Sequence, residues 1–221
     1  MNITTKIKIL FLTAILLCAC GKEEEFIYPA VLTEFVCLET DRKGKGVQLI
    51  TDGGKTWNIP EAQQPTDELT PASIYRVISK YVPFSETGEA DVYVLQSVIA
   101  PLPKAESKFE ETYTDAVSIQ SIWRSGDYLN LILQVMVKDQ KHEFAFIDQG
   151  ITTHEDGTRT LSLMLYHNRN NDVEGFNRKA FLSVPLWHYQ DLLTPGDLIE
   201  FQLNTYKEGM TSRTFINRPH D

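Results

Sequence analysis

Apolar and polar residues alternate along most of the chain, as expected for strands whose side chains point in turn to opposite faces. Helical spacing of apolar residues is nearly absent. In the first half of the chain, turn signals such as Asp-Gly-Gly at 52–54 separate five such segments. The predicted strands are 31–40, 46–51, 55–59, 73–82 and 89–99. Five short strands in this space predict a small barrel of the OB type, assigned to residues 30–105.

The alternation stops at residues 100–115, a charged stretch with two prolines that indicates a linker or domain boundary. It then resumes in six or seven short strands, of which the hairpin 116–124 and 128–138 is the clearest. Pro185 puts the strand that contains it at a sheet edge or bend. The remaining predicted strands are 142–148, 159–167, 178–187, 197–206 and 212–216. They predict a second domain, residues 106–221, with a β-sandwich of the immunoglobulin type, so the expected fold class is all-β.

The N-terminus has the pattern of a secretory signal peptide over residues 1–19. Lys6 and Lys8 precede the apolar run Ile9–Leu17, which is shorter than the roughly 20 residues of a membrane span. Cys20 follows the small residue Ala19, and the pattern Leu-Cys-Ala-Cys resembles the bacterial lipobox. By that resemblance, Cys20 becomes the acylated first residue, and several acyl chains would anchor it stably.

Residues 20–29 are interpreted as an acidic tether that follows this anchor. Its start, Gly-Lys-Glu-Glu-Glu, resembles the surface-export signal of lipoproteins in the phylum Bacteroidota. The ordinary alternative is a solvated linker, because a run of charges often has no other role. We therefore expect an outer-membrane, lipid-anchored protein on the cell surface, with the periplasmic face as the alternative.

The charge of the chain argues against one class of partner. The net charge is −9, and removing Lys6 and Lys8 with the signal lowers it to −11. Both halves are acidic and no basic run stands out, whereas binding to a phosphate backbone needs clustered Lys and Arg. Nucleic acid is not an expected partner. Cys37 is left without a disulfide partner and is expected to be a small buried apolar residue.

The chain lacks the common catalytic motifs. It has no G-x-S-x-G, H-E-x-x-H, P-loop or G-x-G-x-x-G pattern. Carboxylates that are adjacent in sequence, such as Glu110 and Glu111, lie in the predicted linker. The sequence therefore predicts no enzymatic activity and no cofactor, and a glycan or peptide hydrolase is the least favoured alternative.

Two polar loops are the candidates for a metal site. Asn168, Asn170, Asp172 and Glu174 place oxygen atoms at alternate positions, which could suit calcium, but the EF-hand spacing is absent. The sequence His-Glu-Asp-Gly at 154–157 is typical of a hairpin turn for backbone reasons alone. No metal is predicted, and the four residues of the first loop remain weak candidates.

Tryptophan residues are the candidates for a ligand platform, such as one for sugar rings. Trp123 and Trp187 are in phase with the apolar residues of their segments, so both are expected in the core. Trp57 follows a turn, and it is the weak candidate for an exposed ligand-binding residue.

Several segments resemble the NigD-like lipoproteins of Bacteroidota. They are SIYRVISKYVPFS, VYVLQSVIAPLPK, SIQSIWRSGDYLNLILQVMVKDQKHEFAFI and FLSVPLW, of which YLNL is the most specific. The resemblance implies an OB-like domain and a β-sandwich behind a lipobox, and it supplies no catalytic residue. The expected function is a binding or display module for a glycan, peptide or envelope protein. The alternative is an accessory or structural role in envelope assembly or bacteriocin-type peptide export.

Overall fold

The structure is a computed structural model that describes residues 30–65 and 69–218. The predicted signal peptide, Cys20 and the tether lie outside these residues. From Val31 onward the chain forms one compact unit. No helix in the described part of the chain is long and apolar enough to cross a membrane. The all-β class is confirmed, because strands and short 3-10 turns supply all the regular structure of the described residues.

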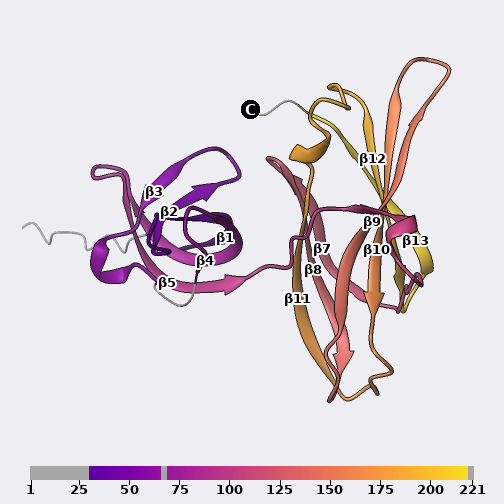
Figure 1. Ribbon diagram of the computed structural model, residues 1–221, viewed down its shortest axis with the longest axis horizontal. Helices are drawn as coiled ribbons and strands as arrows, with labels where there is room; N and C mark the ends of the chain where they lie inside the picture. The colour runs from indigo at the N-terminus through magenta and orange to yellow at the C-terminus, as the bar shows by residue number, and fades with distance from the viewer. Residues whose placement is uncertain (1–29, 66–68, 219–221) are drawn as a thin grey trace, which may run out of the picture. The chain divides into compact units, whose positions relative to one another are not determined.

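The N-terminal half is a closed five-stranded barrel with the strand order β1-β2-β3-β5-β4 (Figure 1). All neighbours are antiparallel except β3 and β5. The strands are β1 (Leu32–Thr40), β2 (Gly46–Thr51), β3 (Thr56–Asn58), β4 (Ile74–Phe84) and β5 (Glu89–Ser97), with a turn η1 (Glu61–Gln63) after β3. Alternate residues of β4 such as Val77 and Tyr81 fill the interior with Val36, Leu38 and Leu49. The predicted OB-like barrel is therefore confirmed.

The segment between the barrel and the next long strand is hydrogen-bonded to the C-terminal sheets. It contains β6 (Lys104–Ala105), which pairs with β9 (Glu143–Thr153), and the turn η2 (Glu106–Lys108). Thr114 forms an isolated bridge with His167. This charged segment with its two prolines is therefore an ordered connection that runs along the sandwich.

The C-terminal half consists of two sheets, with the orders β13-β12-β10-β9-β6 and β11-β8-β7. The strands are β7 (Ser118–Ser125), β8 (Tyr128–Val137), β9 (Glu143–Thr153), β10 (Arg159–Asn168), β11 (Phe176–Pro185), β12 (Leu198–Thr205) and β13 (Gly209–Ile216); the turn η3 (Trp187–Tyr189) follows β11. The pair β10 and β12 is parallel, so the arrangement departs at this point from a purely antiparallel sandwich. Pro185 is the last residue of β11, and β11 lies at the edge of its sheet, as the proline predicts.

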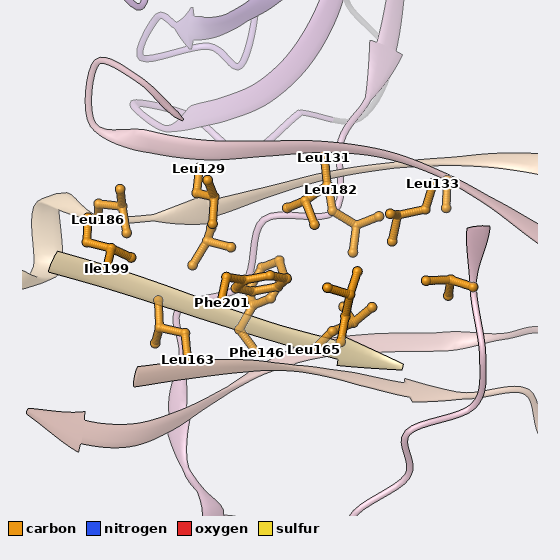
Figure 2. Packing of buried hydrophobic residues seen from close by; sticks show 14 of the residues in the cluster. Leu129, Leu131, Leu133, Phe146, Leu163, Leu165, Leu182, Leu186, Ile199 and Phe201 are labelled. Carbon is orange, nitrogen blue, oxygen red and sulfur yellow. The ribbon is translucent and has the colours of Figure 1, made fainter. Parts of the chain in front are cut away.

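The sandwich core forms where the inner faces of the two sheets meet (Figure 2). Leu129, Leu131 and Leu133 alternate along β8 and are fully buried. They pack with residues of the other sheet that include Phe146 and Phe201. A side chain buried to this extent contributes about 1.5–3 kcal/mol. This core holds β8 and β11 in place, and their outer faces meet the barrel.

Candidate binding grooves at the barrel–sandwich junction

Arg76 is the centre of a buried polar network between the barrel and the sandwich. On β4 its side chain alternates with Tyr75 and Val77, so it points out of the barrel, yet the residue is only 7% exposed. Its Nη1 and Nη2 atoms donate to Oδ1 and Oδ2 of Asp52 at 2.6 and 2.8 Å. This two-bond geometry is the strong form of an arginine–carboxylate pair.

Sandwich residues complete the network. Arg76 Nη2 donates to Asn130 Oδ1 at 3.0 Å, and Arg76 Nε donates to Ser183 Oγ at 3.2 Å. The Tyr128 ring lies over the guanidinium, with 3.8 Å from Cζ to the ring centroid. Burial acts to lower the pKa of Arg76, but the Asp52 carboxylate outweighs it and raises that pKa. Arg76 is thus a fixed positive charge that ties β4 of the barrel to β8 and β11.

Two close contacts fix the junction further. Gly126 lies in the β7–β8 turn with φ +51°, and a Cβ atom there would collide with the Asp52 carbonyl group. Phe35 of β1 contacts Trp123 edge-on at 5.3 Å between ring centroids, and Phe181 at 6.3 Å. The junction is therefore a packed interface with little freedom, and hollows beside it have stable walls.

The first hollow is called here the junction groove and has a volume of about 490 Å³, within the range of ligand sites. Its two most accessible apolar side chains are Ile74, 64% exposed, and Trp187, 43% exposed. None of the described residues that line it is basic. The lining residues are Cys37, Ile50, Thr51, Asp52, Gly53, Gly54, Ile74, Asp127, Tyr128 and Trp187. The groove therefore offers apolar contact beside carboxylates.

The second hollow, called here the aromatic groove, lies between the outer faces of the barrel and of the three-stranded sheet. Its volume is also about 490 Å³. Phe35, Trp123 and Phe181 form one wall, and Lys80 and Lys179 contribute positive charge. Its other lining residues are Thr33, Glu34, Asp52, Ile78, Val94, Gln96, Ser125, Asn130 and Ile132. The two grooves therefore share Asp52 and differ in charge.

The tryptophans are arranged differently from the sequence prediction. Trp57 is partly buried and packs against the barrel core. Trp123 is also partly buried. The prediction that Trp187 belongs to the core is wrong, because β11 ends at Pro185 and the strand phase does not continue into η3. Trp187 is thus the exposed tryptophan of the junction groove.

The oxygen atoms of the loop 168–174 already have protein partners. Asn168 Oδ1 accepts from the Asn170 backbone, and Asn170 Nδ2 donates to the Lys141 carbonyl. The Asp172 carboxylate accepts from the backbone of Lys138, Asp139 and Val173. Burial acts to raise the pKa of Asp172, but these N–H donors lower it well below its usual range. In the part of the chain that the structure describes, no group of three or more His, Cys, Asp or Glu residues is arranged to hold a metal, so Glu174 does not join Asp172 in such a group.

A chain of side chains links Asp172 to two histidines. His142 Nε2 lies 3.4 Å from Asp172 Oδ2, and His142 Nδ1 lies 2.9 Å from His167 Nε2. His167 Nδ1 lies 2.9 Å from the carbonyl oxygen of Asp115, so that nitrogen is the donor. Burial lowers the pKa of His167. The arrangement holds the β8–β9 turn against β10, and it contains no serine, threonine or cysteine side chain.

Cys37 is buried, as predicted, with Sγ 3.4 Å from the Tyr128 hydroxyl oxygen. Neither Arg76 nor Asp52 was a candidate from the sequence. Their partners lie at sequence separations of 24 to 107 residues, so no local pattern could bring them together. The one local signal was a charged residue on a strand face whose neighbours, Ile74 and Ile78, are apolar.

Comparison with known proteins gives consistent results. Residues 100–216 match the model of the NigD-like C-terminal beta sandwich domain. A NigD-like immunity protein from Bacteroides caccae ATCC 43185 is 31% identical, with a TM-score of 0.68 over 88% of this chain and 100% of that one.

Two solved structures at lower identity show the fold alone. A protein described as toxin-related from Parabacteroides distasonis ATCC 8503 is 16% identical, with a TM-score of 0.65 over 87% of this chain and 95% of that one. A protein of unknown function from Bacteroides vulgatus ATCC 8482 is 19% identical, with a TM-score of 0.66 over 86% and 92%. No match was found among curated proteins.

Proposed function

Because this chain belongs to the NigD-like family, we propose that it is a membrane-anchored, non-enzymatic binding protein that holds a polypeptide partner in the junction groove. The Bacteroides caccae relative is described as an immunity protein, which supports a polypeptide partner. A glycan is the less favoured ligand, since Trp57, the residue predicted for it, packs against the barrel core.

The observation that carries this proposal is an exposed apolar groove beside a rigid, buried ion pair. Trp187 and Ile74 are exposed on opposite sides of the junction, one from the sandwich and one from the barrel. Because Arg76 and Asp52 already fix the two halves, binding would cost little ordering of the groove walls. Exposed tryptophans of this kind commonly contribute most to binding.

The chemistry of the groove favours binding over catalysis. Its carboxylate at Asp52 is engaged by Arg76, and its thiol at Cys37 is buried beside the Tyr128 hydroxyl. No histidine lines the groove among the described residues, so the groove lacks the side chain that most often acts as a general base. A partner segment with an apolar side chain would complement the apolar walls that Ile74 and Trp187 give the groove.

The anchor is the second part of the proposal and depends on the sequence of residues 1–29. Cys20 would be acylated, and the acidic tether would place the protein on the outer face of the outer membrane, or on its periplasmic face. Cys20→Ala should move the protein from the membrane fraction to the soluble fraction. Protease added to intact cells should degrade a surface protein and spare a periplasmic one. A Cys20→Ala variant that still fractionates with membranes would end the anchoring idea.

The binding function is tested by isolating the full chain from its own envelope in mild detergent. We expect a polypeptide that co-isolates with the wild type and is depleted about 30-fold with Trp187→Ala, since such an anchor contributes about 2 kcal/mol. Phe84→Ala is the matched control. Phe84, on β4 of the barrel, is an exposed aromatic residue like Trp187, but it lines neither groove. An identical set of polypeptides from all three proteins would contradict the proposal. A partner that is a resident envelope protein would instead support the accessory role.

A further inference from the structure

The outer edge of β11 has free backbone groups along its N-terminal half. On one side β11 pairs with β8 along its whole length. On the other side Ile99 bridges it once, because Ile99 N donates to the Phe181 carbonyl and Ser183 N donates to the Ile99 carbonyl. Strand residues point their N–H and C=O groups to alternate sides. Asn177 and Lys179 therefore direct theirs to the same outer side, where no described strand pairs with them.

A hollow lies on each side of this edge. The aromatic groove lies on the outer face of the sheet, and a second hollow of about 270 Å³, called here the edge hollow, lies toward β9. Both hollows share Gln96, Lys179 and Phe181. A strand added to β11 would continue the sheet (Figure 1), and its alternate side chains would enter the two hollows in turn.

Both hollows carry basic side chains that form no ion pair within the described residues. Lys80 and Lys179 line the aromatic groove, and Lys141 and Arg178 line the edge hollow. The edge hollow has no acidic lining residue among those described. This cluster stands out in a chain whose net charge is −9.

The acids near the cluster are engaged elsewhere. In the aromatic groove, Asp52 is paired with Arg76, and Glu34 accepts a hydrogen bond from Tyr81 at 2.9 Å. The four basic side chains are therefore available to carboxylates of a ligand. One extended strand of that ligand could place side chains in both hollows.

We propose that the outer edge of β11 binds an extended acidic peptide by strand addition, with its backbone on Asn177 and Lys179 and its carboxylates at the four basic residues. A peptide fits better than another polyanion because a peptide backbone supplies the donors and acceptors that a strand edge needs. The inference goes beyond the proposed binding function, because it uses a surface separate from Trp187 and Ile74.

The test uses the full chain in detergent and a fluorescent peptide with the sequence Glu-Glu-Thr-Thr-Glu-Glu-Thr, which places two carboxylates on each face of an extended strand. Binding is followed by fluorescence anisotropy. We expect saturable binding, and Lys179→Glu should raise the dissociation constant about tenfold by replacing an attraction with a repulsion. Asn177→Pro should weaken binding by removing an outward N–H, while an edge position tolerates proline. Lys207→Glu, on the β12–β13 turn, is the matched charge control and should leave binding unchanged.

A second peptide separates strand addition from simple charge attraction. The same sequence with an N-methyl group on every backbone amide keeps its charge but has no N–H group to donate to the ladder, and it should not bind. The proposal is overturned if the first peptide fails to bind saturably, if the methylated peptide binds equally, or if Lys207→Glu weakens binding as much as Lys179→Glu. Trp187→Ala should leave peptide binding intact, so failure of the junction groove and failure of the β11 edge are distinguishable.

Discussion

Replacing Asp52 with asparagine would leave the Arg76 guanidinium buried without its counter-charge. The side chain of Arg76 is 3% exposed and that of Asp52 is 10% exposed, so water cannot substitute for the carboxylate. Removing one partner of such a pair costs about 3–5 kcal/mol. Asparagine keeps one oxygen acceptor, and the Tyr128 ring still stabilises the cation. We therefore expect the lower end, about 3 kcal/mol of the free energy of unfolding.

The assay is urea and thermal denaturation of the full chain. For a protein of this size 1 kcal/mol corresponds to about 2–4 °C, so Tm should fall by about 6–12 °C. The double variant Asp52→Leu with Arg76→Met should be less destabilised than the single variant, because no charge is then left buried. Glu208→Gln is the control, since the Arg213–Glu208 pair is exposed, and its Tm should not change. A loss of less than about 1 kcal/mol for Asp52→Asn would refute the reasoning.

Three further predictions concern packing, the junction and pH. Phe201→Ala, at a fully buried position, should cost about 3–5 kcal/mol in urea denaturation. Gly126→Ala should cost at least about 1 kcal/mol, because its methyl group meets the Asp52 carbonyl; Gly157→Ala, also at positive φ but in open space, measures the backbone strain alone. Burial lowers the pKa of His167 below the ordinary histidine value of about 6.5, so the unfolded state binds more protons below that pH. The free energy of unfolding should therefore fall as the pH drops from about 6.5 toward the pKa of His167 in the folded state. In a series of Tm measurements over this range, Tm should depend less on pH for His167→Gln than for the wild type.

The strands could be predicted because their signal is local. Leu129, Leu131 and Leu133 alternate with polar or less buried residues in β8, and the structure buries all three on one face. Pro185 marked the outer strand because a proline cannot donate to a ladder. Each of these arguments needs only neighbouring residues, and both were confirmed.

The site could not be predicted because its residues meet only in the folded chain. Arg76 on a barrel strand has the pattern of an exposed residue, and its burial depends on Asn130 and Ser183, which lie on sandwich strands far along the chain. Trp187 has the phase of a core residue, and its exposure depends on where β11 ends. Sequence phase predicts the face of a strand, but it does not predict what covers that face.

The central claim is that the junction groove holds a polypeptide partner, and a photo-cross-linking residue at Ile74 in living cells tests it most directly. Ile74 is 64% exposed and lines the groove, whereas Phe84 on the same strand is 40% exposed and lies outside it. The account predicts a discrete cross-linked polypeptide from position 74, absent from position 84 and lost when Trp187→Ala is added. The claim would be contradicted by no adduct at position 74, or by the same adduct from both positions.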